Sequence, residues 1–300
     1  MTYSPRKAEV RFARFAWATL VFNFFVILWG AFVRATGSGA GCGKHWPQCD
    51  GQWIGPAQSV EQLIEFTHRA TAGVALILTV ILVIGACRLF DRGHRVRKAA
   101  WTTLAFMIAE ALLGAGLVLF GLVEDDDSVA RAVVIAAHLL NTLALLGFMA
   151  LTAWWATRPG QLNLTQPAKK AFTLAIAGLF LVGITGAIAA LGDTLFPEAD
   201  HLDNLKPGAH FLLQLRMAHP IVALVVGCGI GMLANNYRSH FLGKCVLTLV
   251  VLQIILGFVN MALYAPIPLQ LTHLLLADLV WVSLILLGAE VLEKTPASTE

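Results

Sequence analysis

Four of the nine histidines lie inside long apolar stretches of the chain and are the first candidates for chemistry: His68, His138, His219 and His273. An ionisable side chain in such surroundings is costly and usually functional. The other five histidines lie in loops or at the margins of the apolar stretches, where contact with water explains them. Imidazole binds haem iron, zinc and copper. The residue type therefore predicts a metal or haem site, and the alternative for any single histidine is a hydrogen bond between helices.

An internal repeat sorts these histidines into two matching pairs. The segment EFTHRATAGVALIL aligns with QLRMAHPIVALVVG, so that His68 matches His219. The segment AAHLLNTLAL aligns with LTHLLLADLV, so that His138 matches His273. Each repeat therefore supplies two imidazoles at a similar depth. Two imidazoles that face each other across a four-helix bundle suit axial ligation of haem iron, with the macrocycle between them.

The sequence thus predicts two bis-histidine haem sites, one in each repeat. Zinc or copper would also accept imidazole, but two ligands without a set of thiolates or carboxylates make a poor cage. The chain has no C-x-x-C-H motif, so covalent attachment of haem is not expected. Arginines near the histidines are predicted to bind the haem propionates, and snorkelling to the membrane interface is their alternative role. They are Arg34, Arg69, Arg131 and Arg216.

The two repeats differ three residues before the first histidine of each pair. Glu65 precedes His68, whereas Arg216 precedes His219. An arginine at this position can hold a propionate, which suits a permanently bound haem. A carboxylate beside a haem edge can accept a proton or stabilise positive charge during an oxidation, so Glu65 is the predicted catalytic residue. A cap on the second apolar helix is the alternative role for Glu65.

Cys42 and Cys49 bracket the sequence CGKHWPQC in the first polar loop. We expect a disulfide between them, because a bridge that closes so short a loop contributes roughly 2 to 3 kcal/mol. Two free thiols are one alternative. A metal site with His45 is the other, although the loop offers few further ligands.

The elements that must carry these residues are membrane-spanning helices. The chain is 58% hydrophobic and 13% charged, with a mean hydropathy of +0.74, which is unusual for a soluble domain. A helix needs about 20 apolar residues to cross the hydrocarbon of a bilayer. Stretches of this kind fall at residues 12–34, 66–89, 99–121, 132–156, 169–191, 212–233, 241–264 and 270–290.

The predicted fold is therefore an all-α integral membrane protein with eight transmembrane helices. The repeat divides it into two halves, residues 1–157 and 158–300, each expected to form a four-helix bundle. Because an even number of spans separates the halves, we expect parallel repeats.

The distribution of lysine and arginine predicts the orientation. With a cytoplasmic N-terminus, 15 of the 21 lysines and arginines lie on the inner side. Both termini are then cytoplasmic, and the haem sites lie near the outer face of a bacterial inner membrane. The net charge of +3 reflects this topology, so no binding of nucleic acid is expected. The first apolar stretch is too long for a cleaved signal peptide and is expected to be retained.

The sequence resembles the haem A synthases over nearly all of its length. The resemblance rests on VRATGSGAGCGKHWPQCDG after the first apolar stretch, on EFTHR, on AAHLLNTLALLG, and on RMAHP and LTHLLLADLVW in the second half. Cys42 and Cys49 match a cysteine pair found in one bacterial branch of that family. The resemblance implies an oxidoreductase acting on a CH3 group, which converts haem O to haem A for terminal oxidases. The methyl at porphyrin carbon 8 becomes a formyl group, with water as the source of oxygen.

The resemblance also implies a role for each site residue. His68 and His138 would bind the substrate haem in the N-terminal half, where Glu65 matches the family's proposed catalytic carboxylate. His219 and His273 would bind a resident haem b in the C-terminal half. Expected partners are the substrate haem O, a haem O synthase, the assembly machinery of a terminal oxidase, membrane lipid, and a quinone or other electron acceptor.

Two other functions remain open. A non-catalytic dihaem b-type electron-transfer protein would use the same four histidines, although a simple electron carrier has no need of the difference between Glu65 and Arg216. A haem transporter or chaperone would need one exchangeable site. Two acids within the apolar stretches, Glu110 and Asp278, are functional candidates. Asp278 is a candidate to orient the imidazole of His273.

Overall fold

The computed structural model describes residues 5–53, 57–158, 161–162, 168–197 and 206–294. Within these residues, eight helices are long and apolar enough to cross a membrane, which confirms the predicted all-α membrane fold. They are α1 (Lys7–Ala35), α2 (Val60–Leu89), α3 (Arg95–Leu119), α4 (Val129–Trp155), α5 (Ala168–Leu195), α6 with α7 (Phe211–Arg216 and Ala218–Asn236), α8 (Phe241–Ala262) and α9 (Ile267–Leu292). A 3-10 turn, η1 (Ser38–Ala40), follows α1, and the strands β1 (Gln161–Leu162) and β2 (Glu293–Lys294) pair antiparallel.

Helix α2 begins six residues before the apolar pattern predicts. Its first residue is Val60, and Ser59 caps it by accepting a hydrogen bond from the backbone N–H of Gln62 at 3.1 Å. The apolar pattern misses this first turn because the turn is polar. Glu65 and His68 consequently lie in the second and third turns of α2, and Glu65 is not the residue that caps the helix.

The sixth spanning segment is divided at Met217, between α6 and α7. Pro220 lies in the first turn of α7, where it offers no N–H and its ring crowds the carbonyl of Arg216, four residues earlier. The sequence pattern predicted one continuous span. The break instead places Arg216 at the end of one helix and His219 at the beginning of the next.

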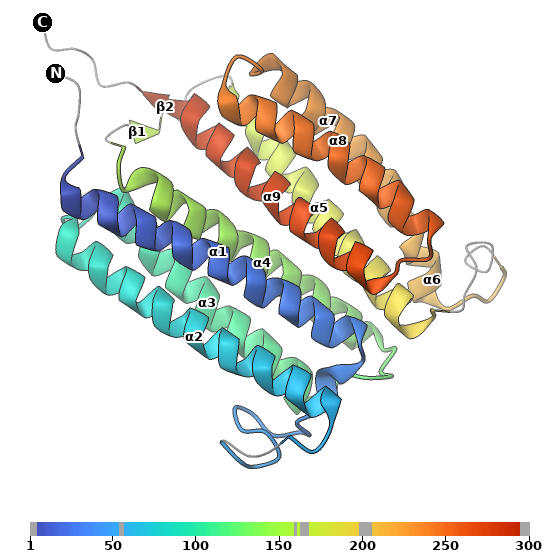
Figure 1. Cartoon of the computed structure of the whole chain (residues 1–300). Helices are drawn as coiled ribbons and strands as arrows, with labels where there is room; N and C mark the ends of the chain where they lie inside the picture. Colours follow the sequence, from blue (N-terminus) through green and yellow to red (C-terminus); the bar gives the residue numbers. More distant parts are fainter. Residues whose placement is uncertain (1–4, 54–56, 159–160, 163–167, 198–205, 295–300) are drawn as a thin grey trace, which may run out of the picture.

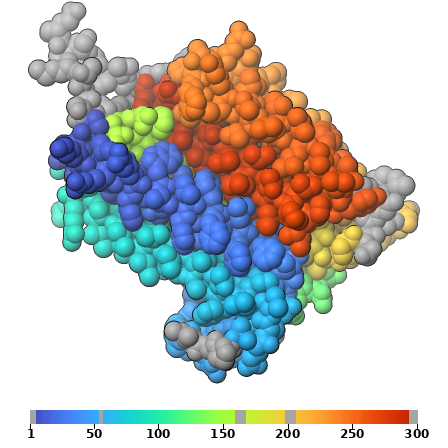
Figure 2. All heavy atoms as spheres, in the orientation of Figure 1, coloured from blue at the N-terminus to red at the C-terminus, as the bar shows by residue number. Residues whose placement is uncertain are grey.

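The helices form two groups of four (Figure 1). Helices α1 to α4 contact one another in a closed ring, and α5, α7, α8 and α9 form a second closed ring. Helices α1, α4, α5 and α9 join the two groups, and Trp281 of α9 donates its Nε1–H to the carbonyl of Leu143 of α4 at 2.6 Å. The two groups make one continuous body (Figure 2). Their relation by an internal repeat stays a prediction from the sequence.

Apolar side chains fill the end of each group at which α1 begins and α9 ends. In the first group the buried cluster includes Phe12, Leu82 and Val96. In the second group it includes Phe172 and Leu287. This packing fixes the helices relative to one another at one end, and the opposite ends of the helices surround a cavity.

Candidate functional site

All four histidines predicted as ligands line a single cavity of about 950 Å³. They come from four helices: His68 from α2, His138 from α4, His219 from α7 and His273 from α9. Each of the eight spanning segments contributes to the lining, which is mostly apolar. The volume is at the upper end of the range for small-molecule and cofactor sites. The two histidine pairs that the sequence predicted, one in each half, line one connected space.

His68 and His138 form the pair of the first helix group. The two rings are close enough to interact electrostatically. Both Nδ1 atoms are buried without a hydrogen-bond partner among the described residues, and that of His138 lies 3.5 Å from Oε1 of Glu110. Buried polar atoms are rarely left unpaired. Nδ1 of His68 therefore lacks a partner among the described residues, whereas Nδ1 of His138 has the carboxylate of Glu110 nearby.

His219 and His273 face each other in the second helix group. Their ring centres are 6.4 Å apart and the ring planes are nearly perpendicular, at 89°. Metal–imidazole bonds of about 2.0 Å on each side would occupy about 4 Å of this separation, and the remainder is the distance from each ring centre to its nitrogen. The spacing therefore suits one metal ion between two imidazoles. Thr185 and Gln253 each place a side-chain polar atom 3.2 Å from a ring nitrogen of the pair.

Glycines allow three of the four imidazole rings to pack directly against a neighbouring helix. A Cβ atom added at these glycines would approach the Cε1 atom of the ring to 3.1 Å or less. The pairs are Gly30 with His68 at 2.8 Å, Gly186 with His219 at 3.0 Å, and Gly257 with His273 at 3.1 Å. Our sequence analysis missed this role. A signal was present, because glycine recurs in the apolar stretches that neighbour the histidines.

The side chains present suit haem better than a bare metal ion. Within the described part of the chain, no group of three or more His, Cys, Asp or Glu side chains could hold a metal ion. Haem requires only axial ligands from the protein, because the macrocycle supplies the other four nitrogens. The facing imidazoles of His219 and His273, a mostly apolar cavity, and the Nδ1 atoms of His68 and His273, which have no partner among the described residues, fit such a group.

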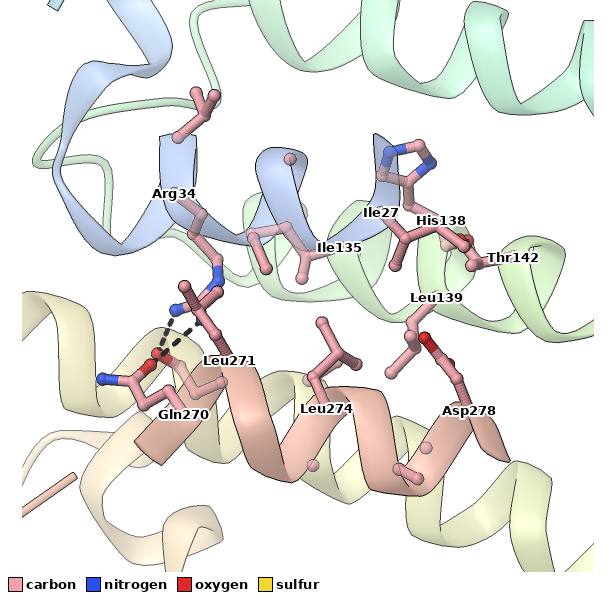
Figure 3. Close-up of a pocket in the computed structure, with 18 of the residues that line it drawn as sticks. Ile27, Arg34, Ile135, His138, Leu139, Thr142, Gln270, Leu271, Leu274 and Asp278 are labelled. Carbon is pink, nitrogen blue, oxygen red and sulfur yellow. Dashed lines mark hydrogen bonds between the residues drawn. The ribbon is translucent and has the colours of Figure 1, made fainter. Parts of the chain in front are cut away.

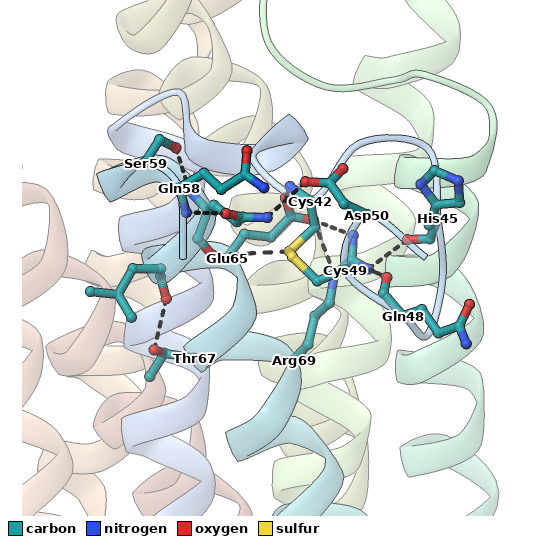
Figure 4. Close-up of a disulfide and its surroundings, with 12 residues drawn as sticks. Cys42, His45, Gln48, Cys49, Asp50, Gln58, Ser59, Glu65, Thr67 and Arg69 are labelled. Carbon is teal, nitrogen blue, oxygen red and sulfur yellow. Dashed lines mark hydrogen bonds and ion pairs between the residues drawn. A yellow bond between two sulfur atoms is a disulfide. The ribbon is translucent and has the colours of Figure 1, made fainter. Parts of the chain in front are cut away.

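Glu65 of α2 lines the same cavity as His68 and contacts the loop between α1 and α2 (Figure 4). Its Oε2 accepts a hydrogen bond from the backbone N–H of Cys42 at 2.7 Å. Its Oε1 accepts from Arg69, at 2.5 Å from Nη2 and 3.1 Å from Nε. Glu65 is only 2% exposed. The structure thus brings the predicted catalytic residue to the histidine cavity, together with partners that the sequence did not reveal.

The loop around the cysteine pair is fastened to α2 through the same residues. Cys42 and Cys49 form a disulfide, as predicted. Arg69 donates through Nη1 to the carbonyls of His45 and Gln48, both at 2.5 Å. Most of the donors of Arg69 are therefore engaged within the protein. Trp46, Pro47 and Trp53 of the loop line the cavity together with Arg69.

Arg131 and Arg216, two more of the four arginines predicted to bind propionates, also line the cavity. Arg131 donates to the carbonyls of Glu124 at 2.5 Å and Asp126 at 2.7 Å, while its Nε is buried without a partner among the described residues. Arg216 forms an ion pair with Asp193, with 3.1 Å between Nη1 and Oδ1.

Arg34 connects the two helix groups. It extends from the end of α1 to the second group, where Nη1 donates to the carbonyl of Ala190 and to Thr194 Oγ1 of α5, each at 2.5 Å. Its Nη2 donates to Gln270 Oε1 of α9 at 3.2 Å, a contact visible in Figure 3. The four arginines therefore place positive charge on the cavity wall, at the end of the helix groups opposite the buried apolar clusters.

Comparison with known proteins identifies the family. The family model described as cytochrome oxidase assembly protein (COX15-CtaA) matches residues 13–285. A heme A synthase from Lysinibacillus sphaericus is 28% identical over 286 residues, which cover 89% of this chain and 91% of that protein. A heme A synthase from Geobacillus kaustophilus is 39% identical over 107 residues, 36% of this chain and 34% of that protein.

A longer relative also matches. A protein named protoheme IX farnesyltransferase from Thermus thermophilus is 45% identical over 297 residues, which cover 95% of this chain but 49% of that protein. The chain thus spans about half the length of this relative. Since the family model extends over most of the sequence and heme A synthases match along it, the chain belongs to the haem A synthase family of cytochrome oxidase assembly proteins.

Proposed function

We propose that the chain is an oxidoreductase that converts haem O to haem A by oxidising the porphyrin C8 methyl to a formyl group. Its family supports a role in haem A biosynthesis in general. One observation carries the finer proposal. Two pairs of imidazoles line one cavity, and three residues before the first histidine of one pair lies the buried carboxylate of Glu65, where the other pair has Arg216.

The two pairs have different roles in this proposal. His68 and His138 bind the substrate haem O in the N-terminal half, because Glu65 lies beside this pair. His219 and His273 bind a resident haem b in the C-terminal half. The resident haem supplies one-electron transfer from the substrate to a quinone or another acceptor.

The overall change determines what the protein must provide. A methyl group and water give a hydroxymethyl group, two electrons and two protons. The hydroxymethyl group and a second water give a hydrated aldehyde, again with two electrons and two protons. Loss of water from the hydrated aldehyde leaves the formyl group. Each step therefore needs a proton acceptor beside the reacting methyl. Glu65 is the carboxylate that the structure holds beside His68.

The hydrogen bonds of Glu65 leave it able to accept a proton. A carboxylate has about four accepting positions, and the donors of Arg69 and Cys42 occupy three of them. The remaining position on Oε2 can accept a hydrogen bond from water and orient it for attack. The guanidinium of Arg69 fixes the carboxylate in place.

The names of the relatives are consistent with the proposed conversion of haem O to haem A. The heme A synthase from Lysinibacillus sphaericus matches along 91% of its own length. The Thermus protein named for farnesyl transfer is about twice as long as the matched region, so its name does not assign that reaction to this chain. Farnesyl transfer to protohaem yields haem O, so a haem O synthase is a proposed partner, with terminal oxidase assembly proteins. In a dihaem electron carrier, Glu65 would have only its structural role of binding Arg69 and the backbone of Cys42.

Haem analysis tests the proposed reaction. The protein is co-expressed with a haem O synthase, and the non-covalent haems are extracted and separated by chromatography. Haem A should appear only when this protein is present. Haem O that accumulates unchanged would overturn the proposal.

Glu65→Ala tests the role of the carboxylate. Haem A formation should fall by about 100-fold or more, the usual contribution of a general base, while the absorption spectrum of the resident haem b stays the same. Glu61→Ala is the matched control, because Glu61 is exposed and lies one turn earlier on α2. Haem A formation that persists in Glu65→Ala would show that the proton acceptor is another group.

A further inference from the structure

A second acidic side chain in the cavity has no role in the reaction proposed above. Asp278 of α9 is 0% exposed, and both of its carboxyl oxygens are buried without a hydrogen-bond partner among the described residues. Buried carboxyl groups are nearly always hydrogen-bonded, because the loss of water is otherwise not offset. Asp278 lines the cavity. Its missing partner therefore belongs to something that enters the cavity.

Helix geometry directs Asp278 away from the histidine of its own helix. Five residues separate it from His273, which is a rotation of about 140° at 3.6 residues per turn. His273 faces α8, where its ring packs on Gly257. Asp278 points instead towards α4 of the first group, and Figure 3 shows it opposite Leu139 and Thr142. Asp278 therefore does not orient His273, and it faces the side of the cavity that contains His138.

Other polar side chains surround this deep end of the cavity. Glu110 of α3 lies within electrostatic range of Asp278 and accepts hydrogen bonds from Asn141 and Thr142 of α4, both at 2.5 Å. Asn23 of α1 is 2% exposed and lines the same space. The charged and titratable groups here are thus two carboxyls and the imidazole of His138. No arginine or lysine among the described residues neutralises Asp278 by a hydrogen bond or an ion pair.

The outer end of the cavity has the opposite character. Arg34 and Gln270 lie there, and Gln270 is eight residues before Asp278, or about 12 Å along α9. Apolar side chains lie between the two ends (Figure 3): Ile27, Ile135, Leu271 and Leu274. The cavity therefore has a cationic outer end, an apolar middle and an acidic deep end. This order suits a flat apolar ligand with carboxylates at one edge and a hydrogen-bonding group at the opposite edge.

We propose that Asp278 is a binding residue that exchanges a hydrogen bond with a hydroxyl group of the ligand. A hydroxyl both donates and accepts, so it suits the carboxyl in either protonation state. The inference rests on the proposed function, because haem O has propionates at one edge and a hydroxyl beside its isoprenoid chain. Protohaem has a vinyl group instead. A haem without the hydroxyl leaves the oxygens of Asp278 unpaired, and the site selects against it.

Competitive haem binding tests this inference. Protein purified with its resident haem b is titrated with haem O and, separately, with protohaem, and the second binding event is followed by absorbance. Wild type should prefer haem O. Asp278→Leu should reduce the ratio of the two affinities by roughly tenfold to hundredfold, because the variant removes the cost of about 1 to 3 kcal/mol for leaving a buried polar group unpaired when protohaem binds. The isoprenoid chain contributes equally in wild type and variant, so it cancels from this comparison.

Two further variants separate binding from folding. Asp278→Asn keeps an accepting oxygen and should retain most of the preference. Thr152→Val removes a buried polar group of α4 that does not line the cavity, so the preference should be unchanged. An unchanged ratio in Asp278→Leu, or an equal loss of affinity for both haems, would overturn the inference and leave a water-binding or structural role.

The experiments distinguish a failure of the proposed role of Asp278 from a failure of the proposed reaction. If wild type makes haem A but Asp278→Leu still prefers haem O to the same degree, the inference fails alone. If wild type shows the hydroxyl preference but makes no haem A, the proposed reaction fails and the binding role of Asp278 stands.

Discussion

At the scale of single residues, the smallest side chains position the chemically active ones. A methyl group at Gly30 would collide with the ring of His68, and one at Gly186 would crowd the ring of His219. The imidazoles can approach the neighbouring helix only because no Cβ is present there. Each ring is thereby held against a rigid surface. Its orientation towards the cavity depends on a residue with no chemistry of its own.

Alanine substitutions at these glycines should affect one pair at a time. Gly30→Ala is expected to weaken haem O binding at the His68 pair, and Gly186→Ala to weaken haem b binding at the His219 pair. Overpacking costs about 1 to 3 kcal/mol, which is roughly a fivefold to 150-fold loss of affinity. Absorbance titration measures both sites.

Gly229→Ala on α7 is the control, because no atom of the described residues lies within 4 Å of a Cβ there. It should bind both haems normally. If Gly30→Ala and Gly186→Ala each weakened both sites equally, the glycines would support general helix packing instead of individual rings.

At the scale of elements, the loop between α1 and α2 and helix α2 itself act as one unit. The disulfide closes the loop, and Glu65 and Arg69 bind the loop backbone at Cys42, His45 and Gln48. The carboxylate proposed to accept protons is thus fixed by the loop backbone and by Arg69. The loop between α1 and α2 therefore helps to position Glu65 and also lines the cavity.

Loss of the disulfide should loosen this unit. The double variant Cys42→Ser and Cys49→Ser is expected to reduce the stability of the loop by roughly 2 to 3 kcal/mol, because a short loop is no longer closed covalently. Tryptic cleavage after the exposed Lys44 should accelerate by roughly 30-fold to 150-fold, following the population of the open loop. Cys87→Ser, which removes a free cysteine of α2, should leave the cleavage rate unchanged. Equal rates in the double variant and wild type would mean that the contacts to Glu65 and Arg69 hold the loop alone.

The sequence predicted some of these features because they depend on local composition. Apolar length identified eight helices, and the cost of an ionisable group in an apolar stretch identified the four histidines. The sequence could not predict that Arg34 contacts Gln270, 236 residues away, because that contact depends on how the two helix groups pack. The break before Pro220 and the direction of Asp278 likewise emerge only when neighbouring helices are placed.

At the scale of the whole molecule, the two ends differ in packing and in chemistry. The end at which α1 begins is filled by apolar clusters, and the other end holds the cavity, the arginines and Glu65. Lysines and arginines predict that the filled end is cytoplasmic. In that orientation, protons that Glu65 accepts in the proposed reaction would leave to the outer aqueous side. The oxidation would then release its protons on one side of the membrane only.

Cysteine labelling decides this orientation. Cys87, Cys228 and Cys245 are replaced by serine, and single cysteines are introduced as Leu263→Cys, at the cavity end, or Arg92→Cys, in the turn between α2 and α3. Both positions are exposed. In right-side-out vesicles, a membrane-impermeant maleimide should label Leu263→Cys and leave Arg92→Cys unlabelled, and inside-out vesicles should reverse the result. The opposite pattern would place Glu65 and its released protons on the cytoplasmic side, so the positive charges would not report the topology of this chain.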